Sequence, residues 1–225
     1  ISQEGLKLIA CVSMLVDHIG AILLPEIMWL RIVGRMAFPI YCFLIAEGAH
    51  YTRNPMKYAL RLAVGMVLVE VPFDLLFYDG LTWEHSSVMV TLLLGCGMML
   101  AMERVKSIWW KLALMLPFGV AADLLGSDYG GHGIAIIAML YLTRGIPNEN
   151  FWRMASFAVL LWFGAEITLL GLTFPMELLG FGGVLLTFCY DGRKITKNKW
   201  VQWGFYLFYP VHILVIWLLK VLLHG

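Results

Sequence analysis

The chain has 225 residues, of which 61% are hydrophobic and 14% are charged, with a formal net charge of +1 and a mean hydropathy of +0.82. Water-soluble domains are about half apolar and about a quarter charged, so this composition excludes an ordinary soluble globular domain. The near-neutral charge gives no indication of nucleic-acid binding. Apolar runs of about 18 residues or more recur along the chain, which is typical of membrane-spanning helices.

We predict an all-α fold, a polytopic membrane helix bundle of about nine transmembrane helices. The predicted spans are residues 6–25, 36–52, 58–77, 86–102, 108–125, 131–143, 152–171, 174–190 and 200–223. The loops are short and no polar linker divides the chain, so we expect one domain over residues 1–225. With the N-terminus inside, all but three of the 16 Lys and Arg residues lie on the inner side; the exceptions are Arg31, Arg35 and Lys220. This bias predicts a multi-pass protein with its N-terminus inside.

The first span contains an ionisable pair, Asp17 and His18, within a run that otherwise suits lipid. Ionisable residues inside a membrane are costly, and each is a functional hypothesis by default. Because imidazole titrates near neutrality, His18 is a candidate general base. Asp17 points about 100° away around the helix and need not contact His18, so we interpret it as a group that orients the base or stabilises its charge. The alternative for His18 is an interhelical hydrogen bond without a catalytic role.

His212 lies near the middle of the last span, two residues after Pro210. A proline inside a helix removes a backbone hydrogen bond and can open the backbone locally. The spacing of Tyr209 and His212 places them on one helical face. We interpret His212 as a second base, a ligand or a hydrogen-bonding clip.

Arg31 and Arg35 are four residues apart and share a face if their segment is helical. Two guanidinium groups on one face suit a phosphate or a carboxylate. The alternative is that they are counter-charges for acidic residues at the outer side of the membrane.

A basic turn follows the second span on the predicted inner side. Glu47 lies near the inner end of that span, and Arg53, Lys57 and Arg61 follow it. These basic side chains suit the phosphates of a cytoplasmic cofactor, and they are also what an inner loop of a membrane protein ordinarily contains.

Acidic residues concentrate in the outer halves of the predicted spans, among them Glu70 and Asp74. A carboxylate facing lipid is costly, so we expect an acid-rich vestibule that opens outward. Such a vestibule favours a cationic guest such as an amine, or neutralises Arg31 and Arg35. The glycine-rich segment SDYGGHG supplies Asp128 and Tyr129 as candidates for its mouth; the alternative is a simple turn.

Several sequence motifs of other enzyme classes are absent. The chain contains no H-E-x-x-H, G-x-S-x-G or P-loop motif, and we predict no metal site. The four cysteines (Cys11, Cys42, Cys96 and Cys189) lie in apolar runs without a C-x-x-C pair, so we interpret them as small packing residues.

Four blocks of sequence carry a resemblance to a known family. They read LKLIACVSMLVDHIGAIL, LRIVGRMAFPIYCFLIAEGAHYTRNPMKYALRL, SDYGGHGIAII and YLFYPVHILVI. Together they resemble the TraX family of membrane proteins, whose best-known member is linked to N-terminal acetylation of F-pilin. That family is distantly similar to the acyltransferase-three and lysosomal heparan N-acetyltransferase groups, which move an acyl group from cytoplasmic acyl-CoA to an acceptor across the membrane.

The resemblance implies an integral-membrane acetyltransferase of the cytoplasmic (inner) membrane, with acetyl-CoA as acyl donor. The acceptor is an unidentified amine, such as a peptide N-terminus, or a hydroxyl. The positions that the resemblance carries over are Asp17 and His18 as the core of the site, Arg31 and Arg35 as paired arginines, and Asp128, Tyr129 and His212 as later polar positions. The stretch VEVPFD departs from the more neutral Ser-Gln-x-Pro-Phe pattern, which leaves the acceptor open.

Our hypothesis from the sequence assigns three groups of residues. The predicted catalytic residues are His18, Asp17 and His212; those for the acyl-CoA are Arg31, Arg35, Arg53, Lys57 and Arg61; those for the acceptor are Asp128, Tyr129, Glu70, Asp74 and Glu47. The expected partners are acyl-CoA, the acceptor and membrane lipid, with no nucleic acid. The alternatives are a proton-coupled transporter or flippase that uses Asp17 and His18 as a relay, and a non-catalytic assembly factor in which His18→Ala is silent.

Overall fold

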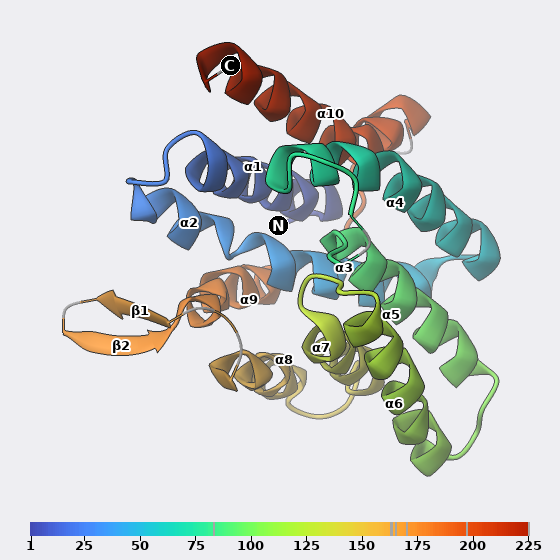
Figure 1. The fold of residues 1–225 in the computed structure, drawn as a ribbon. Coiled ribbons are helices and arrows are strands. Elements are labelled where there is room, and N and C mark those ends of the chain that lie inside the picture. The colour runs from blue at the N-terminus through green and yellow to red at the C-terminus, as the bar shows by residue number, and fades with distance from the viewer. Residues whose placement is uncertain (83, 163, 165, 170, 197, 225) are drawn as a thin grey trace. The chain divides into compact units, whose positions relative to one another are not determined.

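The computed structural model describes residues 1–82, 84–162, 164, 166–169, 171–196 and 198–224. Its helices are α1 (Gln3–Ile22), α2 (Met28–Gly34), α3 (Ala37–Tyr51), α4 (Pro55–Phe77), α5 (Val88–Glu103), α6 (Ile108–Leu124), α7 (Gly130–Leu142), α8 (Glu149–Phe157), α9 (Phe181–Phe188) and α10 (Lys199–His224) (Figure 1). Two 3-10 helices, η1 (Ala158–Trp162) and η2 (Met176–Gly180), and two strands, β1 (Glu166–Leu169) and β2 (Leu172–Pro175), complete the described elements. The predicted helical class is confirmed, apart from the strands.

The chain forms two compact units, and both are discontinuous in sequence. The first unit comprises Ile1–Tyr41, Val71–Leu81 and Leu160–Gly225, and the second comprises Cys42–Glu70 and Thr82–Val159. The expectation of one domain over residues 1–225 stays a prediction.

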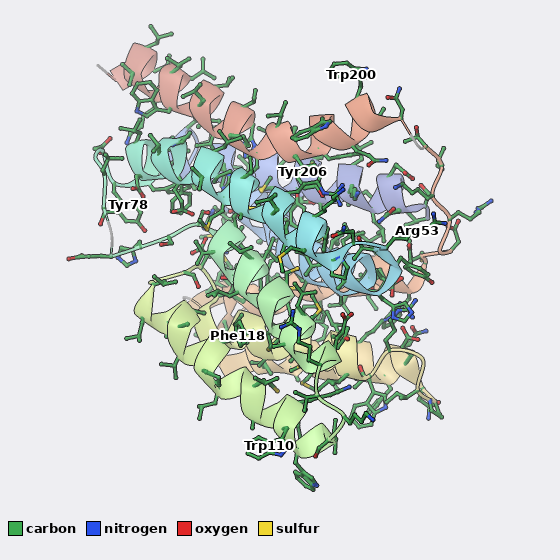
Figure 2. All side chains as sticks on the ribbon, turned by 90° about the vertical axis from the view of Figure 1, so that its right-hand side faces the viewer. Arg53, Tyr78, Trp110, Phe118, Trp200 and Tyr206 are labelled. Carbon is green, nitrogen blue, oxygen red and sulfur yellow. The ribbon has the colours of Figure 1, made fainter. Side chains whose placement is uncertain are left out.

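In the first unit, α1 packs against α2 and α10, and α2 contacts η2. Ser2 begins α1 as its N-cap, because its hydroxyl accepts a hydrogen bond from the backbone N–H of Gly5 at 3.1 Å. One face of α10 is buried, and its opposite face is exposed yet wholly apolar, comprising Leu207, Val211, Leu214, Val215, Leu218 and Leu222. Trp200, at the start of α10, projects from the ribbon (Figure 2). An outward apolar stripe flanked by tryptophan is typical of a helix that faces lipid.

In the second unit, α5, α6 and α7 pack against one another and α8 packs against α7. The core contains fully buried methionines and isoleucines, including Met98 and Met102 of α5 and Ile137 of α7. Ser87 caps α5, since its hydroxyl accepts a hydrogen bond from the N–H of Met89 at 3.3 Å. Trp110 at the start of α6 is exposed and extends away from the helix (Figure 2).

Three helical segments within the described residues are long and apolar enough to cross a membrane. They are Gln3–Ile22, Met28–Tyr51, which joins α2 and α3, and Trp200–Leu223. Shorter apolar helices cover Val88–Glu103, Gly130–Leu142 and Met176–Phe188. These lengths and compositions are those of a helical membrane protein.

The predicted span 152–171 is wrong as a continuous helix. The predicted span 174–190 begins within strand β2 but is helical over Met176–Phe188. Helix α8 ends at Phe157, and a β-hairpin pairs Glu166 with Pro175 and Leu169 with Leu172. The segment contains β-branched residues on both strands, which favour extended backbone. Gly171 adopts φ +80°, a left-handed conformation that suits a hairpin turn and ends a helix. Residues 163, 165 and 170 of the first predicted span lie outside the described residues.

Candidate active site

Two histidines that are far apart in the sequence meet in the first unit. Nδ1 of His18, on α1, lies 2.8 Å from Nε2 of His212, on α10. Nδ1 of His212 lies 2.7 Å from the backbone carbonyl oxygen of Phe208, one helical turn earlier. His18 is 8% exposed and His212 is 5% exposed. The sequence placed both residues in spans, but only the fold brings them into contact.

Aromatic rings hold the histidine pair in a defined orientation. The two imidazoles are nearly parallel, with an interplanar angle of 10° and ring centroids 5.0 Å apart. Tyr209 stacks beside both, at 5.9 Å from His18 and 5.5 Å from His212. Phe77, the last residue of α4, meets His18 edge-on at 5.5 Å. This packing restricts rotation of the imidazole of His18.

Asp17 binds the two arginines rather than lying alongside His18. Nη1 of Arg31 donates to Oδ2 of Asp17 at 2.6 Å, and Nη2 of Arg35 donates to both carboxylate oxygens at 2.6 Å. Nη1 of Arg35 also donates to Oε1 of Glu177 at 2.7 Å. Asp17 and Glu177 are both buried. The four side chains form a charge-balanced cluster, which we call the arginine–carboxylate cluster.

The close approach of α2 to α1 depends on Gly34. A Cβ atom at this position would lie 2.2 Å from Oδ1 of Asp17 and 2.3 Å from its Cβ. Any side chain here would therefore displace Asp17 from the arginines. The absence of a side chain allows Arg31 and Arg35, at either side of Gly34, to reach the same carboxylate.

Glu177 is the member of the cluster that the sequence did not assign. It lies on η2, immediately after the hairpin, and is 7% exposed. The sequence pointed to such a residue only indirectly, because two arginines on the predicted outer side require more than one carboxylate for charge balance. Asp74, which we predicted as an acceptor-binding residue, is also buried in this unit, on α4.

The remaining predicted site residues belong to the second unit. Glu70 accepts hydrogen bonds from the hydroxyl of Ser87 at 2.6 Å and from its N–H at 3.2 Å, so it supports the start of α5. Asp128 is exposed, and its backbone carbonyl accepts a hydrogen bond from Thr91. Tyr129 adopts φ +64° before α7. The predicted phosphate-binding residues Arg53, Lys57 and Arg61 are exposed around the start of α4, and Figure 2 labels Arg53.

Glu47 belongs to a second ionic cluster in this unit. Its carboxylate accepts a hydrogen bond from Nε of Arg144, whose Nη2 also donates to the hydroxyl of Tyr51 at 2.8 Å. The guanidinium of Arg144 lies over the ring of Tyr51 at 4.9 Å. These contacts connect the end of α3 to the segment after α7.

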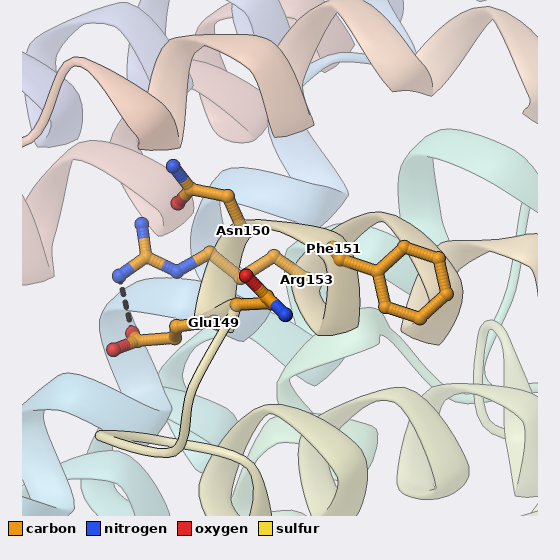
Figure 3. A pocket seen from close by; sticks show the side chains of 5 residues that line it. Glu149, Asn150, Phe151 and Arg153 are labelled. Atoms are coloured by element: carbon orange, nitrogen blue, oxygen red, sulfur yellow. Dashed lines mark hydrogen bonds and ion pairs between the residues drawn. The ribbon is translucent and has the colours of Figure 1, made fainter.

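A cavity of about 460 Å³ lies at the start of α8, lined by Asn148, Glu149, Asn150, Phe151 and Arg153. Figure 3 shows Arg153 paired with Glu149, while Phe151 points in another direction. Burial by itself would raise the pKa of Glu149, but the hydrogen bonds from Arg153 and from the N–H of Gly145 outweigh it and lower that pKa. Glu149 is therefore a permanent anion at neutral pH.

Comparison with known proteins gives a match over nearly the whole length. The profile of the family described as TraX protein matches residues 2–220. The chain belongs to the TraX family. It is 27% identical to the "Probable fimbrial assembly protein FimC, serogroup H1" of Dichelobacter nodosus, over 96% of this chain and 94% of that protein. It is 25% identical to "Protein TraX" of Escherichia coli (strain K12), over 95% of this chain and 85% of that protein.

A further relative is an uncharacterized protein of Rickettsia prowazekii, 23% identical over 95% of this chain and 90% of that protein. No solved structure matches the chain. The resemblance to the TraX family that we noted in the sequence is confirmed.

Proposed function

We propose that this TraX-family protein is an integral-membrane acetyltransferase that moves an acetyl group from acetyl-CoA to an amine or hydroxyl acceptor. The observation that carries the proposal is the buried contact between His18 and His212, at 2.8 Å and enclosed by aromatic rings. An imidazole held in a fixed orientation, with a second imidazole beside it, is an arrangement suited to general acid–base catalysis. Burying two ionisable side chains within membrane helices costs free energy, and residues of this kind in membrane segments usually have a function.

In the proposed reaction, a neutral amine attacks the carbonyl carbon of the acetyl thioester. His18 removes the proton from the attacking nitrogen as the new C–N bond forms. The C–S bond of the tetrahedral intermediate then breaks, and the proton held by His18 passes to the departing thiolate. The products are the acetylated amine and CoA with a free thiol. A positioned base of this kind accelerates transfer by about 10²–10⁴.

The arginine–carboxylate cluster supplies fixed charge beside the base. Asp17 lies next to His18 in the sequence, and the side chain of Arg31 is 27% exposed. We assign Arg31 and Arg35 to stabilising the oxyanion of the intermediate or an anionic group of a substrate. Arg53, Lys57 and Arg61 are exposed basic side chains that suit the phosphates of acetyl-CoA.

For the acceptor, we propose the amino group of a pilus or fimbrial subunit. This choice is supported by the name of the Dichelobacter nodosus relative, a probable fimbrial assembly protein that this chain matches over nearly its full length. An N-terminal amine is also a better nucleophile near neutral pH than a lysine side chain, since its ordinary pKa is about 8 rather than about 10.

The contacts of Asp17 argue against the alternative of a proton-coupled transporter. A relay through Asp17 and His18 requires the two groups to exchange a proton. Asp17 instead accepts hydrogen bonds from Arg31 and Arg35, and His18 pairs with His212.

We place the protein in the cytoplasmic (inner) membrane as a multi-pass protein with its N-terminus inside. The support is the distribution of basic residues together with the three long apolar segments.

The proposal is tested with purified protein in lipid nanodiscs. Acetyl-CoA is expected to raise the unfolding temperature, and a peptide with a free N-terminus is expected to gain one acetyl group by mass spectrometry. The matched controls are CoA without an acetyl group and the same peptide with a blocked N-terminus. A wild-type protein that neither binds acetyl-CoA nor turns it over with any amine or hydroxyl acceptor would refute the proposal.

A further inference from the structure

We propose that His212 is a positioning residue that fixes the tautomer of His18, so that Nε2 of His18 is the nitrogen that takes the proton. The inference rests on the proposed function for its catalytic consequence. Its structural content, the location of one proton on each ring, stands on the geometry alone.

The argument starts from the carbonyl oxygen of Phe208. A carbonyl oxygen only accepts hydrogen bonds, so the 2.7 Å contact requires a proton on Nδ1 of His212. In a neutral imidazole the other nitrogen then carries a lone pair. Nε2 of His212 is therefore an acceptor, and the group 2.8 Å from it, Nδ1 of His18, must be the donor.

The consequence for His18 follows directly. With its proton on Nδ1, the neutral ring has its lone pair on Nε2. Free neutral histidine in water prefers the opposite tautomer, with the proton on Nε2. In that tautomer Nε2 has no lone pair and cannot accept a proton. The backbone of α10 thus determines, through His212, which nitrogen of His18 is basic.

The contact also survives the proton transfer. When Nε2 of His18 gains a proton, Nδ1–H still donates to the lone pair of His212, so the pair does not rearrange during the reaction. The positive charge is stabilised by a neutral acceptor, which allows the proton to leave again. Near-parallel stacking with Tyr209, at 22° to His18 and 15° to His212, maintains the alignment that this requires.

The site offers a matched pair of substitutions. An asparagine at position 212 places its amide near the position of Nδ1, where it can still donate to Phe208, but it has no atom at the position of Nε2. Leucine removes both contacts. We expect His18 to lose its acceptor in both H212N and H212L, while H212N retains the contact within α10.

The experiment is 15N NMR of histidine-labelled protein in nanodiscs, at a pH well above the ordinary histidine pKa of about 6.5. The resonances of His18 are assigned by their loss in H18Q. The wild-type protein should show His18 protonated at Nδ1 and unprotonated at Nε2, and H212N should shift it to the Nε2–H tautomer. In the transfer assay, H212N should lower kcat at least tenfold with little change in KM.

A wild-type His18 with its proton on Nε2 would overturn the inference, and so would an unchanged tautomer in a folded H212N. If H212N does not fold, the wild-type spectrum alone decides. The two proposals fail separately. The expected tautomer without any acetyl transfer refutes only the proposed function, whereas acetyl transfer with the Nε2–H tautomer refutes only the role of His212.

Discussion

Gly34 is the position at which the packing of the site is most directly tested. In Gly34→Ala, the new Cβ would lie 2.2 Å from Oδ1, 2.3 Å from Cβ and 2.6 Å from Cγ of Asp17. Asp17 cannot turn aside freely, because Arg31 and Arg35 hold its carboxylate. We therefore expect α2 to move away from α1, or Asp17 to leave the arginines.

The cost follows from the size of the overlap. Adding one methyl group to a packed interior destabilises a protein by about 1–3 kcal/mol. For a chain of this length, each kcal/mol of lost stability lowers the unfolding temperature by roughly 2–4 °C, so we expect a decrease on the order of 2–12 °C. The control is Gly204→Ala on α10, where a Cβ meets nothing within 4 Å. Alanine is the better helix former by about 1 kcal/mol, so Gly204→Ala should be neutral or stabilising.

The assay uses the cysteines of the chain. Cys11, Cys42 and Cys96 are buried and Cys189 is exposed, so a thiol-reactive dye reports unfolding once Cys189 is replaced by serine. Each glycine variant is compared in that background. If Gly34→Ala unfolds at the wild-type temperature or above, the close packing of Gly34 against Asp17 is refuted.

Three further predictions use the same thermal assay. Arg35→Met leaves two buried carboxylates without their shared guanidinium, which should cost about 3–5 kcal/mol, with Arg35→Lys recovering only part of it. The pKa of Glu149 is lowered in the fold, so its contact with Arg153 stabilises the protein fully above the ordinary carboxyl pKa of about 4.3. This stabilisation is lost as the pH falls through the lowered pKa. Wild type should therefore unfold at a higher temperature than Glu149→Gln at pH 7, and the two unfolding temperatures should converge in acid. Lys220→Met should cost at most about 1 kcal/mol, because its partner Asp79 is largely exposed; a larger loss would contradict that assignment.

The three basic residues that break the inward charge bias each have a carboxylate partner in the first unit. Arg31 binds Asp17, Arg35 joins Asp17 to Glu177, and Lys220 donates to Asp79 at 2.7 Å. Lys220 also donates to the backbone carbonyl of Leu76 at 3.2 Å, near the end of α4. Compensation by local acids explains how these charges are accommodated on the predicted outer side.

The sequence was informative where local chemistry decides the structure. Continuous apolar runs predicted α1 and α10, because helix is the economical way to satisfy the backbone of a long apolar segment in lipid. The same logic identified His18 and His212 as costly residues. It failed at residues 152–171, where apolar composition masked the strand preference of the β-branched residues and the turn at Gly171.

Residue spacing alone could not predict which side chains contact each other when they lie far apart in the sequence. The contact between His18 and His212 joins residues 194 positions apart, and Glu177 reaches Arg35 over 142 positions. Only the packing of α10 and η2 in the first unit determines these pairs. Helical periodicity indicated that the side chains of Asp17 and His18 point in different directions. It did not reveal that Arg31 and Arg35 both bind the carboxylate of Asp17.

The most direct test of the central claim is the initial rate of CoA release from acetyl-CoA in the presence of an amine acceptor, measured for wild type and for His18→Gln in nanodiscs. Glutamine keeps a polar side chain of similar size but cannot act as a base at neutral pH. We predict that His18→Gln lowers the rate by about 10²–10⁴ while acetyl-CoA binding stays close to wild type. Equal rates for the two proteins would contradict the account.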